Sequence, residues 1–253
     1  MNVNAYLERI SVLRGVQFLP DLESLRLLHT RHLFSVPFEN LDIHWKRPIT
    51  IDADRFYEKI VEYKRGGFCY ELNGLFNELL RSLGFTTRLI SARVSKGGNP
   101  GPEFDHAAII VTIGDKEYLA DVGFGDFTAE PLRFVVDLEQ KDATGMFVIR
   151  RFDDQYFEVA KRDGETWKSE YIFKDIARDL GEFADMCEFQ QYSPESHFTK
   201  GKLCSIMTEN GRKTLTDGKF IVTANGTKRE TAVCDDYDFD KVLADEFGIV
   251  RVQ

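Results

Sequence analysis

The stretch RGGFCYELNGLF, residues 65–76, sets a cysteine between two glycines and a strongly amphipathic segment. Apolar residues then recur at helical spacing, and a glycine follows where a helix commonly ends: Leu72, Leu75, Phe76, Leu79, Leu80, Leu83 and Gly84. This pattern predicts a helix that begins close to Cys69. A helix N-terminus favours a thiolate, and Gly66 and Gly67 would let the backbone turn and leave the sulfur open to approach. Cys69 is therefore a candidate nucleophile, with a packing cysteine as the alternative.

Helices are also predicted before this stretch. Asp21 can cap a helix that carries Leu22, Leu25, Leu28 and Leu33 and ends before Pro37, and Asp52 can cap another with Phe56 and Ile60 inward. After it, apolar and β-branched runs predict strands over 86–94, 106–113, 117–124, 145–152, 155–162 and 167–173. Residues 174–191 have a helical pattern. The tail predicts hairpin strands with turns at 210–211, 217–218 and 225–226, then a helix over 238–247. Helices first and strands later indicate an α+β fold.

The composition suits one large domain, or two to three small ones sharing a core, with 253 residues and 43% hydrophobic residues. A net charge of −9 without a basic stripe argues against a nucleic-acid partner. No apolar run approaches a membrane span, and the first residues do not read as a signal peptide. The four cysteines are widely spaced, which argues against a zinc site or a disulfide framework. Free thiols then favour the cytoplasm.

An imidazole and a carboxylate are predicted to meet across a hairpin. His106 opens an apolar strand, and Asp121 follows Ala120 in another. A turn at 114–115 would place residues whose numbers sum to about 229 opposite each other, which brings His106 within a couple of residues of the position facing Asp121. With Cys69 these two form a possible nucleophile, base and orienter. Taken alone, His106 could be a strand-end histidine and Asp121 a turn residue.

The remaining titratable residues have simpler interpretations. His29 and His32 are expected at the surface or the edge of the core, and His44 and His197 have no identifiable partner. Cys187, Cys204 and Cys234 are read as structural. Arg65 could add positive charge near Cys69 or pair with Glu71 or another carboxylate.

The segments RGGFCYELNGLF, FDHAAIIV and LADVGFG, with VPFENLDIH at 36–44, resemble the arylamine N-acetyltransferases over essentially the whole chain. The resemblance implies a helical bundle over 1–84 that carries the nucleophile, an antiparallel β-barrel-like domain over 85–190 that carries the histidine and aspartate, and an α/β lid over 191–253. It also implies a core related to papain-like and transglutaminase-like cysteine enzymes.

The resemblance further implies a ping-pong acetyl transfer from acetyl-CoA to an arylamine or arylhydrazine. Cys69 would carry the acetyl group as a thioester, His106 would act as its base, and Asp121 would orient His106. Phe38, Val94 and Phe124 would line the acceptor pocket. O-acetylation of N-hydroxyarylamines is a second implied activity, and no metal is expected.

The glycine-rich segment KGGNPG, residues 96–101, could offer backbone amides to the phosphates of CoA. Lys96, Gly97 and Gly98 are the candidates there, and the resemblance adds Thr208. A plain solvent loop is the alternative for this segment.

Two other functions fit the same residues. A cysteine amide hydrolase or transglutaminase-like enzyme could use the same triad, because water and amines attack the same thioester. A non-catalytic binding domain with a decayed site is the other. Acetylation of Cys69 by acetyl-CoA would distinguish the acetyltransferase from the hydrolase. A reactive Cys69 would distinguish it from a non-catalytic binding domain.

Overall fold

The structure is a computed structural model that describes residues 1–12, 15 and 18–251. Its first third is helical, as predicted: α1 (Val3–Arg9), α2 (Leu22–Ser35), α3 (Leu41–His44), α4 (Ala53–Tyr57), a π-helix η1 (Glu58–Glu62) and α5 (Cys69–Ser82). Asp21 caps α2 by accepting a hydrogen bond from the Ser24 N–H (2.8 Å), and Asp52 caps α4. The second predicted helix therefore exists, but its end is π-helical.

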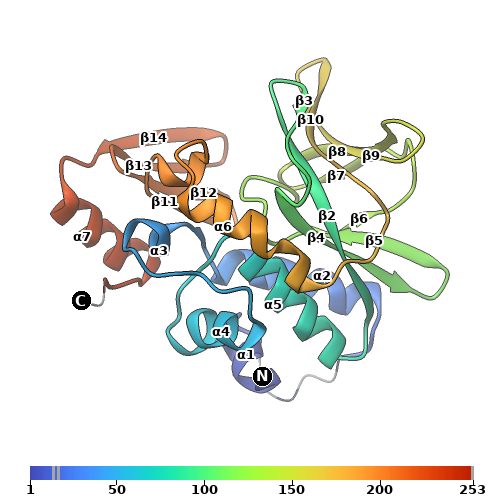
Figure 1. The fold of residues 1–253 in the computed structure, drawn as a ribbon, viewed down its shortest axis with the longest axis horizontal. Helices are drawn as coiled ribbons and strands as arrows, with labels where there is room; N and C mark the ends of the chain where they lie inside the picture. Colours follow the sequence, from blue (N-terminus) through green and yellow to red (C-terminus); the bar gives the residue numbers. More distant parts are fainter. Residues whose placement is uncertain (13–14, 16–17, 252–253) are drawn as a thin grey trace.

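The middle of the chain forms a nine-stranded, curved antiparallel sheet (Figure 1). Its order is β6-β5-β4-β2-β10-β9-β8-β7, with β3 paired to β2. The strands are β2 (Thr86–Lys96), β3 (Asn99–Pro100), β4 (His106–Ile113), β5 (Lys116–Ala120), β6 (Leu132–Arg133), β7 (Gln140–Asp142), β8 (Gly145–Arg151), β9 (Phe157–Asp163) and β10 (Thr166–Phe173). This is the barrel-like sheet that was expected.

A second, five-stranded sheet has the order β1-β11-β12-β13-β14. Its last four strands come from the tail: β11 (Leu203–Thr208), β12 (Gly211–Thr216), β13 (Lys219–Ala224) and β14 (Thr227–Ala232), followed by α7 (Asp236–Phe247). The short helices η2 (Leu180–Phe183), α6 (Ala184–Tyr192) and η3 (His197–Thr199) connect the two sheets. The edge strand β1 (Phe38–Glu39) comes from the N-terminal third and pairs with Cys204 and Ser205 of β11.

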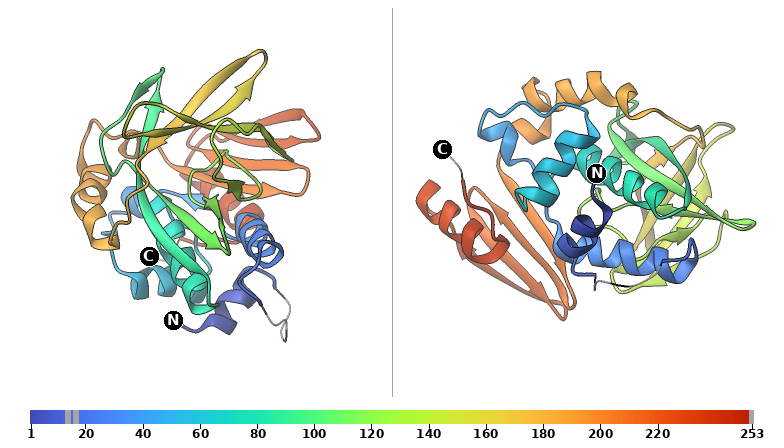
Figure 2. Two further views of the ribbon diagram at one scale, coloured as in Figure 1. Left: turned by 90° about the vertical axis from the view of Figure 1, so that its right-hand side faces the viewer. Right: turned by 90° about the horizontal axis from the view of Figure 1, so that it is seen from below.

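The N-terminal helices lie between the two sheets (Figures 1 and 2). Helix α5 packs against β4 and β2, and the predicted apolar face of α5 is fully buried: Leu72, Leu75, Phe76, Leu79 and Leu80. Each such side chain contributes roughly 1.5–3 kcal/mol through burial. The helix that begins at Cys69 is thereby fixed against the strand that begins at His106.

Most predicted boundaries lie within two residues of the observed ones, and two elements differ by more. The strand predicted over 117–124 ends at Ala120, so Asp121 and Phe124 lie in the loop after it. The helical region predicted from residue 174 begins only at Leu180. The α+β class is correct, and the division at residues 84 and 190 stays a prediction. None of the described helices is both long and apolar enough to span a membrane.

Candidate active site

The turn before α5 is held by a close approach to β1. The N–H of Glu39 donates to the carbonyl of Gly67 (2.9 Å), and Phe38 and Gly67 form a parallel bridge. A Cβ on Gly66 would lie 2.0 Å from the Pro37 carbonyl oxygen, so only glycine fits there. Cys69 follows as the first residue of α5, and it is buried. The predicted place of the thiol at a helix N-terminus is therefore correct.

His106 and Asp121 meet as the hairpin register predicts. Ile109 pairs with Ala120 and Ile110 with Leu119, so the numbers of facing residues sum to 229. The Nε2 atom of His106 lies 2.7 Å from Oδ2 of Asp121, and both side chains are buried. This bond leaves Nδ1 as the second nitrogen of the imidazole, the one available for another partner.

Cys69 lies against the neighbours of both residues. The backbone N–H of Ala107, directly after His106, donates a hydrogen bond to the Cys69 sulfur. On the other side, a Cβ on Gly123 would lie only 2.9 Å from the Cα of Cys69. The three sequence-predicted residues thus converge from α5, β4 and the loop after β5.

Asn73, which was not predicted from the sequence as a site residue, joins the same three elements. Its side-chain amide donates to the Ala107 carbonyl (2.6 Å) and to Oδ1 of Asp121 (2.8 Å), and its oxygen accepts from the Val122 N–H (2.9 Å). Asn73 lies four residues after Cys69, and therefore on the same face of α5. An amide within an otherwise apolar helix face was the signal that could have identified it.

His29 and His32 are fully buried, so their predicted place at the surface or core edge is wrong. The Asp121 N–H donates to Nε2 of His29 (3.2 Å), while Nδ1 of His29 donates to the Ala129 carbonyl (3.1 Å). Burial lowers the pKa of His29 to about 4, so the ring is neutral and suited to accept that bond. The Tyr171 hydroxyl donates to Oδ2 of Asp121 (3.2 Å).

The three residues expected to line the acceptor pocket differ in how close they lie to the imidazole of His106. Phe124 packs edge-to-face against His106, with ring centroids 5.1 Å apart. Val94 pairs with Tyr171 between β2 and β10, and the Tyr171 ring is 5.4 Å from His106. Phe38 lies on the other side, beside Gly67, with its ring 6.1 Å from that of Phe198. Phe124 is thus in direct contact with the imidazole, whereas Phe38 borders the nucleophile turn.

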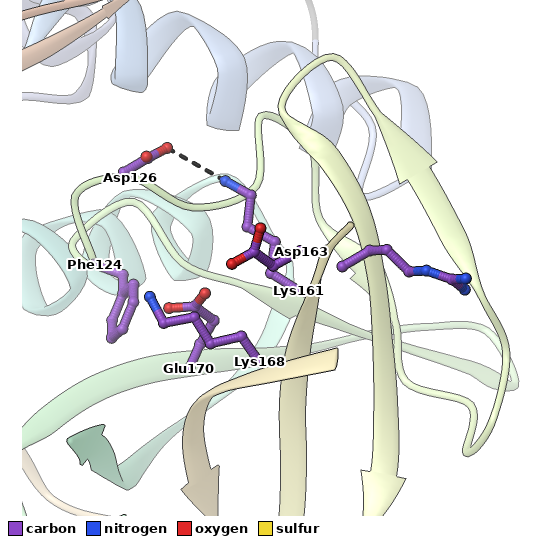
Figure 3. A pocket seen from close by; sticks show the side chains of 7 residues that line it. Phe124, Asp126, Lys161, Asp163, Lys168 and Glu170 are labelled. Carbon is purple, nitrogen blue, oxygen red and sulfur yellow. Dashed lines mark hydrogen bonds and ion pairs between the residues drawn. The ribbon is translucent and has the colours of Figure 1, made fainter. Parts of the chain in front are cut away.

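A cavity of about 380 Å³ opens next to Phe124 (Figure 3). Its other lining residues are all charged: Asp126, Lys161, Arg162, Asp163, Lys168 and Glu170. Lys161 pairs with Asp126 across the cavity at 3.4 Å. The aromatic side of the site is therefore continuous with a polar, charged one.

The N-acetyltransferase family matches the sequence over residues 21–252. The chain belongs to the arylamine N-acetyltransferase family. The arylamine N-acetyltransferase / N-hydroxyarylamine O-acetyltransferase of Salmonella typhimurium is 32% identical, over 91% of this chain and 83% of its own.

Solved structures agree with this assignment. The arylamine N-acetyltransferase of Mycobacterium marinum in complex with CoA is 28% identical, with a TM-score of 0.89 over 98% of this chain and 93% of its own. An arylamine N-acetyltransferase from Bacillus cereus, described with a unique Cys-His-Glu catalytic triad, is 27% identical, with a TM-score of 0.90 over 99% and 100% of the two chains.

In this arylamine N-acetyltransferase, burial raises the pKa of the Cys69 thiol well above its ordinary value, and the Asp105 and Asp121 carboxylates act in the same direction. The hydrogen bond from Ala107 opposes them. From the sequence, the helix N-terminus was predicted to lower this pKa, but burial outweighs it. A thiolate here consequently needs a counter-charge on the imidazole.

Asp121 is the ionised partner of that imidazole. Burial alone would raise its pKa, but the charge and hydrogen bond of His106, with further bonds from Asn73 and the Gly123 N–H, bring the pKa below its ordinary value. A buried carboxylate that stays ionised both orients the ring and stabilises an imidazolium.

The expected CoA residues occupy two separate places in this arylamine N-acetyltransferase. Gly97 and Gly98 have positive φ angles and form the exposed two-residue turn between β2 and β3, next to Lys96. Thr208 lines a different cavity, of about 540 Å³, together with Lys161 and Arg212. The turn of Gly97 and Gly98 does not line that cavity. Within residues 1–12, 15 and 18–251, no group of three or more His, Cys, Asp or Glu side chains is arranged to hold a metal.

Proposed function

We propose that this enzyme transfers the acetyl group of acetyl-CoA to the nitrogen of an arylamine or arylhydrazine, through a thioester on Cys69. The observation that carries the proposal is the His106–Asp121 bond of 2.7 Å beside a cysteine at the start of a buried helix. The family membership and the CoA complex of the Mycobacterium marinum relative support the choice of donor.

In the first half-reaction, His106 accepts the thiol proton as the Cys69 sulfur attacks the acetyl carbonyl carbon. A sulfur–carbon bond forms, the bond between that carbon and the sulfur of CoA breaks, and the leaving thiolate takes the proton back from the imidazolium. The Cys69 N–H, at the first position of α5, has no intrahelical acceptor and can bind the oxyanion of the tetrahedral intermediate. Asp121 stabilises the imidazolium throughout.

In the second half-reaction, the amine nitrogen attacks the thioester carbon and loses a proton to His106. The Cys69 thiolate leaves and regains that proton, so the enzyme returns to its starting state. The exchange between two thioesters is nearly balanced in energy, which makes the nucleophile and the base the decisive groups.

We assign the acceptor ring to the side lined by Phe124, Val94 and Phe38, because Phe124 contacts His106 and aromatic rings favour edge contacts with one another. For CoA we propose the turn of Lys96, Gly97 and Gly98, together with Thr208. O-acetylation of N-hydroxyarylamines, an activity in the name of the Salmonella typhimurium relative, uses the same thioester. Free thiols in the described chain are compatible with the predicted cytoplasmic location.

The proposal is tested by mixing the protein with acetyl-CoA and measuring its intact mass and its tryptic peptides. We expect one acetyl group on Cys69, released when an arylamine is added, and none in Cys69→Ala. An unmodified Cys69 in a protein that hydrolyses amides would favour the cysteine hydrolase, and a Cys69 that neither acetylates nor alkylates would favour a non-catalytic domain.

A second measurement assigns the base. Without its counter-charge, the buried thiol should ionise at higher pH, so the pH profile of Cys69 alkylation should move upward in His106→Ala. Acetyl transfer should fall by about a hundredfold or more, the usual contribution of a general base. Retention of most of the transfer activity in His106→Ala would remove this residue from the mechanism.

A further inference from the structure

Five charged side chains lie buried behind the turn that presents Cys69, and none of them has a role in the transfer described above. They are Glu39, Asp42, Lys59, Arg65 and Glu71, three carboxylates and two cations whose side chains are at most 12% exposed. Burying this many charges is costly unless each is closely paired. We therefore expect these charges to have a role other than packing in the core.

Lys59 is the centre of this cluster. Its Nζ lies 2.8 Å from Asp42, 2.8 Å from the nearer oxygen of Glu71 and 3.7 Å from Glu39. Lys59 belongs to the π-helix η1, the irregular end of the predicted second helix. A π-helical turn carries an additional residue, which changes where its side chains point, and such turns are frequent at functional sites.

Lys59 holds the nucleophile turn at both ends. Its carbonyl accepts a hydrogen bond from the Arg65 N–H (3.0 Å), where the turn begins. Its ammonium holds Glu71, whose Oε2 accepts from the Phe68 N–H (3.1 Å), directly before Cys69. The turn passes so close that a Cβ on Gly67 would lie 2.8 Å from Glu71.

Arg65 does not duplicate this role. Its guanidinium bonds to Glu39 (2.6 Å) and Asp42 (3.1 Å) and stacks on the Trp45 ring at 4.6 Å. It does not pair with Glu71, one of the partners considered from the sequence. The cation that reaches the backbone before Cys69 through a carboxylate is Lys59.

We propose that Lys59 is a positioning residue for the nucleophile: through Glu71 at one end and its own carbonyl at the other, it fixes the turn of residues 65–69 and thereby the place of the Cys69 sulfur beside His106. The consequence for acetyl transfer rests on the proposed function. The effect on the reactivity of Cys69 does not, since alkylation needs neither CoA nor an acceptor.

The test compares the alkylation of Cys69 and Cys234 by iodoacetamide in the same molecule, by peptide mass spectrometry across a range of pH. Cys234 is exposed and serves as the internal reference. In Lys59→Met we expect the Cys69 rate to fall by about tenfold or more, because a hydrogen bond to a charged group is lost. The Cys234 rate should be unchanged, and Lys59→Arg should recover most of the loss.

Lys64→Met is the matched control. Lys64 is exposed, lies in the same segment, and its ammonium forms no ion pair with the part of the chain that the structure describes. We expect it to leave the ratio of the two alkylation rates unchanged. In transfer assays, Lys59→Met should lower kcat and leave the KM for the acceptor nearly constant.

If Lys59→Met does not fold, Glu71→Gln tests the positioning role of Lys59 instead. A glutamine oxygen can still accept from the Phe68 N–H, but it offers no charge to Lys59, so a several-fold loss of Cys69 reactivity is expected in a folded protein above about pH 7, where Glu71 is ionised. A wild-type ratio in folded Lys59→Met or in Glu71→Gln would overturn the positioning role. If the ratio responds while the wild-type protein takes no acetyl group, the positioning role stands and the proposed function fails.

Discussion

Asn73 shows how much a single uncharged side chain contributes to this site. It makes three buried hydrogen bonds, to the Ala107 carbonyl, Oδ1 of Asp121 and the Val122 N–H. These bonds join the helix of the nucleophile to the strand of the base and to the loop of the carboxylate. A site built from three elements depends on such a connection.

Replacing this side chain should therefore affect both stability and activity. Asn73→Ala leaves the Ala107 carbonyl and the Val122 N–H without this partner, at about 1–3 kcal/mol for each unsatisfied group, while Oδ1 of Asp121 keeps the hydrogen bond from the Gly123 N–H (3.0 Å). We expect a loss of roughly 2–4 kcal/mol in the free energy of unfolding, measured with urea, and at least a tenfold loss of acetyl transfer.

Asn77 provides the matched control for that prediction. It lies one turn further along α5 and is also buried, but its Oδ1 has no hydrogen-bond partner among the residues that the structure describes. Asn77→Ala should cost clearly less stability than Asn73→Ala and leave transfer close to wild type. Equal losses in the two variants would mean that the three bonds of Asn73 have no special weight.

The sequence was informative about some of these residues and not others. The meeting of His106 and Asp121 could be predicted because a two-residue turn fixes the register of a hairpin. The contacts of Asn73 and His29 join residues 48 and 92 positions apart. No local pattern specifies such pairs, and His29 was accordingly misplaced at the surface.

At the scale of elements, the turn before α5 is fixed by backbone contacts. Because a Cβ on Gly66 would lie 2.0 Å from the Pro37 oxygen, Gly66→Ala must displace either β1 or the turn. We expect it to destabilise the protein by roughly 2–4 kcal/mol in thermal or urea unfolding. The alkylation rate of Cys69 should fall with it.

Gly181→Ala tests whether any added methyl group has this effect. Gly181 lies in the short helix η2 with open space around its Cα and without a left-handed φ angle. Alanine there should leave stability unchanged or raise it by about 0.4–1 kcal/mol, because it restricts the unfolded chain. If Gly66→Ala were as stable as Gly181→Ala, the close approach at the turn would be unimportant.

Helix positions were predictable from apolar spacing, but the π-helix η1 was not. The pattern around Phe56 and Ile60 is the same for a regular helix and for one that widens by one residue per turn. The extra residue is stabilised by charges that come from β1, α3 and α5, so its cause is distant in sequence. The strand before Asp121 was predicted too long for the same reason, because contacts with residues distant in sequence determine where it ends.

At the scale of the whole molecule, buried titratable groups make stability depend on pH in two opposing ways. Burial lowers the pKa of His29 to about 4 and that of His32 well below its ordinary value, so the unfolded chain binds more protons below pH ~6.5 and acid destabilises the fold. Burial raises the pKa of Glu71 to about 7, so the folded state holds an extra proton and loses stability as pH rises from about 4.5 to 7.

The two effects partly cancel between pH 5 and 7, and removing one should reveal the other. In Glu71→Gln, the free energy of unfolding should rise from pH 5 to pH 7 more steeply than in the wild type, by on the order of 2 kcal/mol. Urea unfolding at both pH values measures this. Glu78→Gln, at a partly exposed position on the same helix, should keep the wild-type slope. Equal slopes in all three proteins would contradict the burial effect on Glu71.

The pairing of β1 with β11 has a consequence for how the protein is made. Phe38 and Glu39 pair with Ser205 and Cys204, and they also hold Gly67 before the nucleophile. During synthesis the strand that completes this sheet leaves the ribosome more than a hundred residues after Cys69. A nascent chain that already contains every reactive group is therefore expected to remain inactive until its last quarter emerges. For the same reason, neither terminal portion can be exchanged with that of a homologue unless the other is exchanged too.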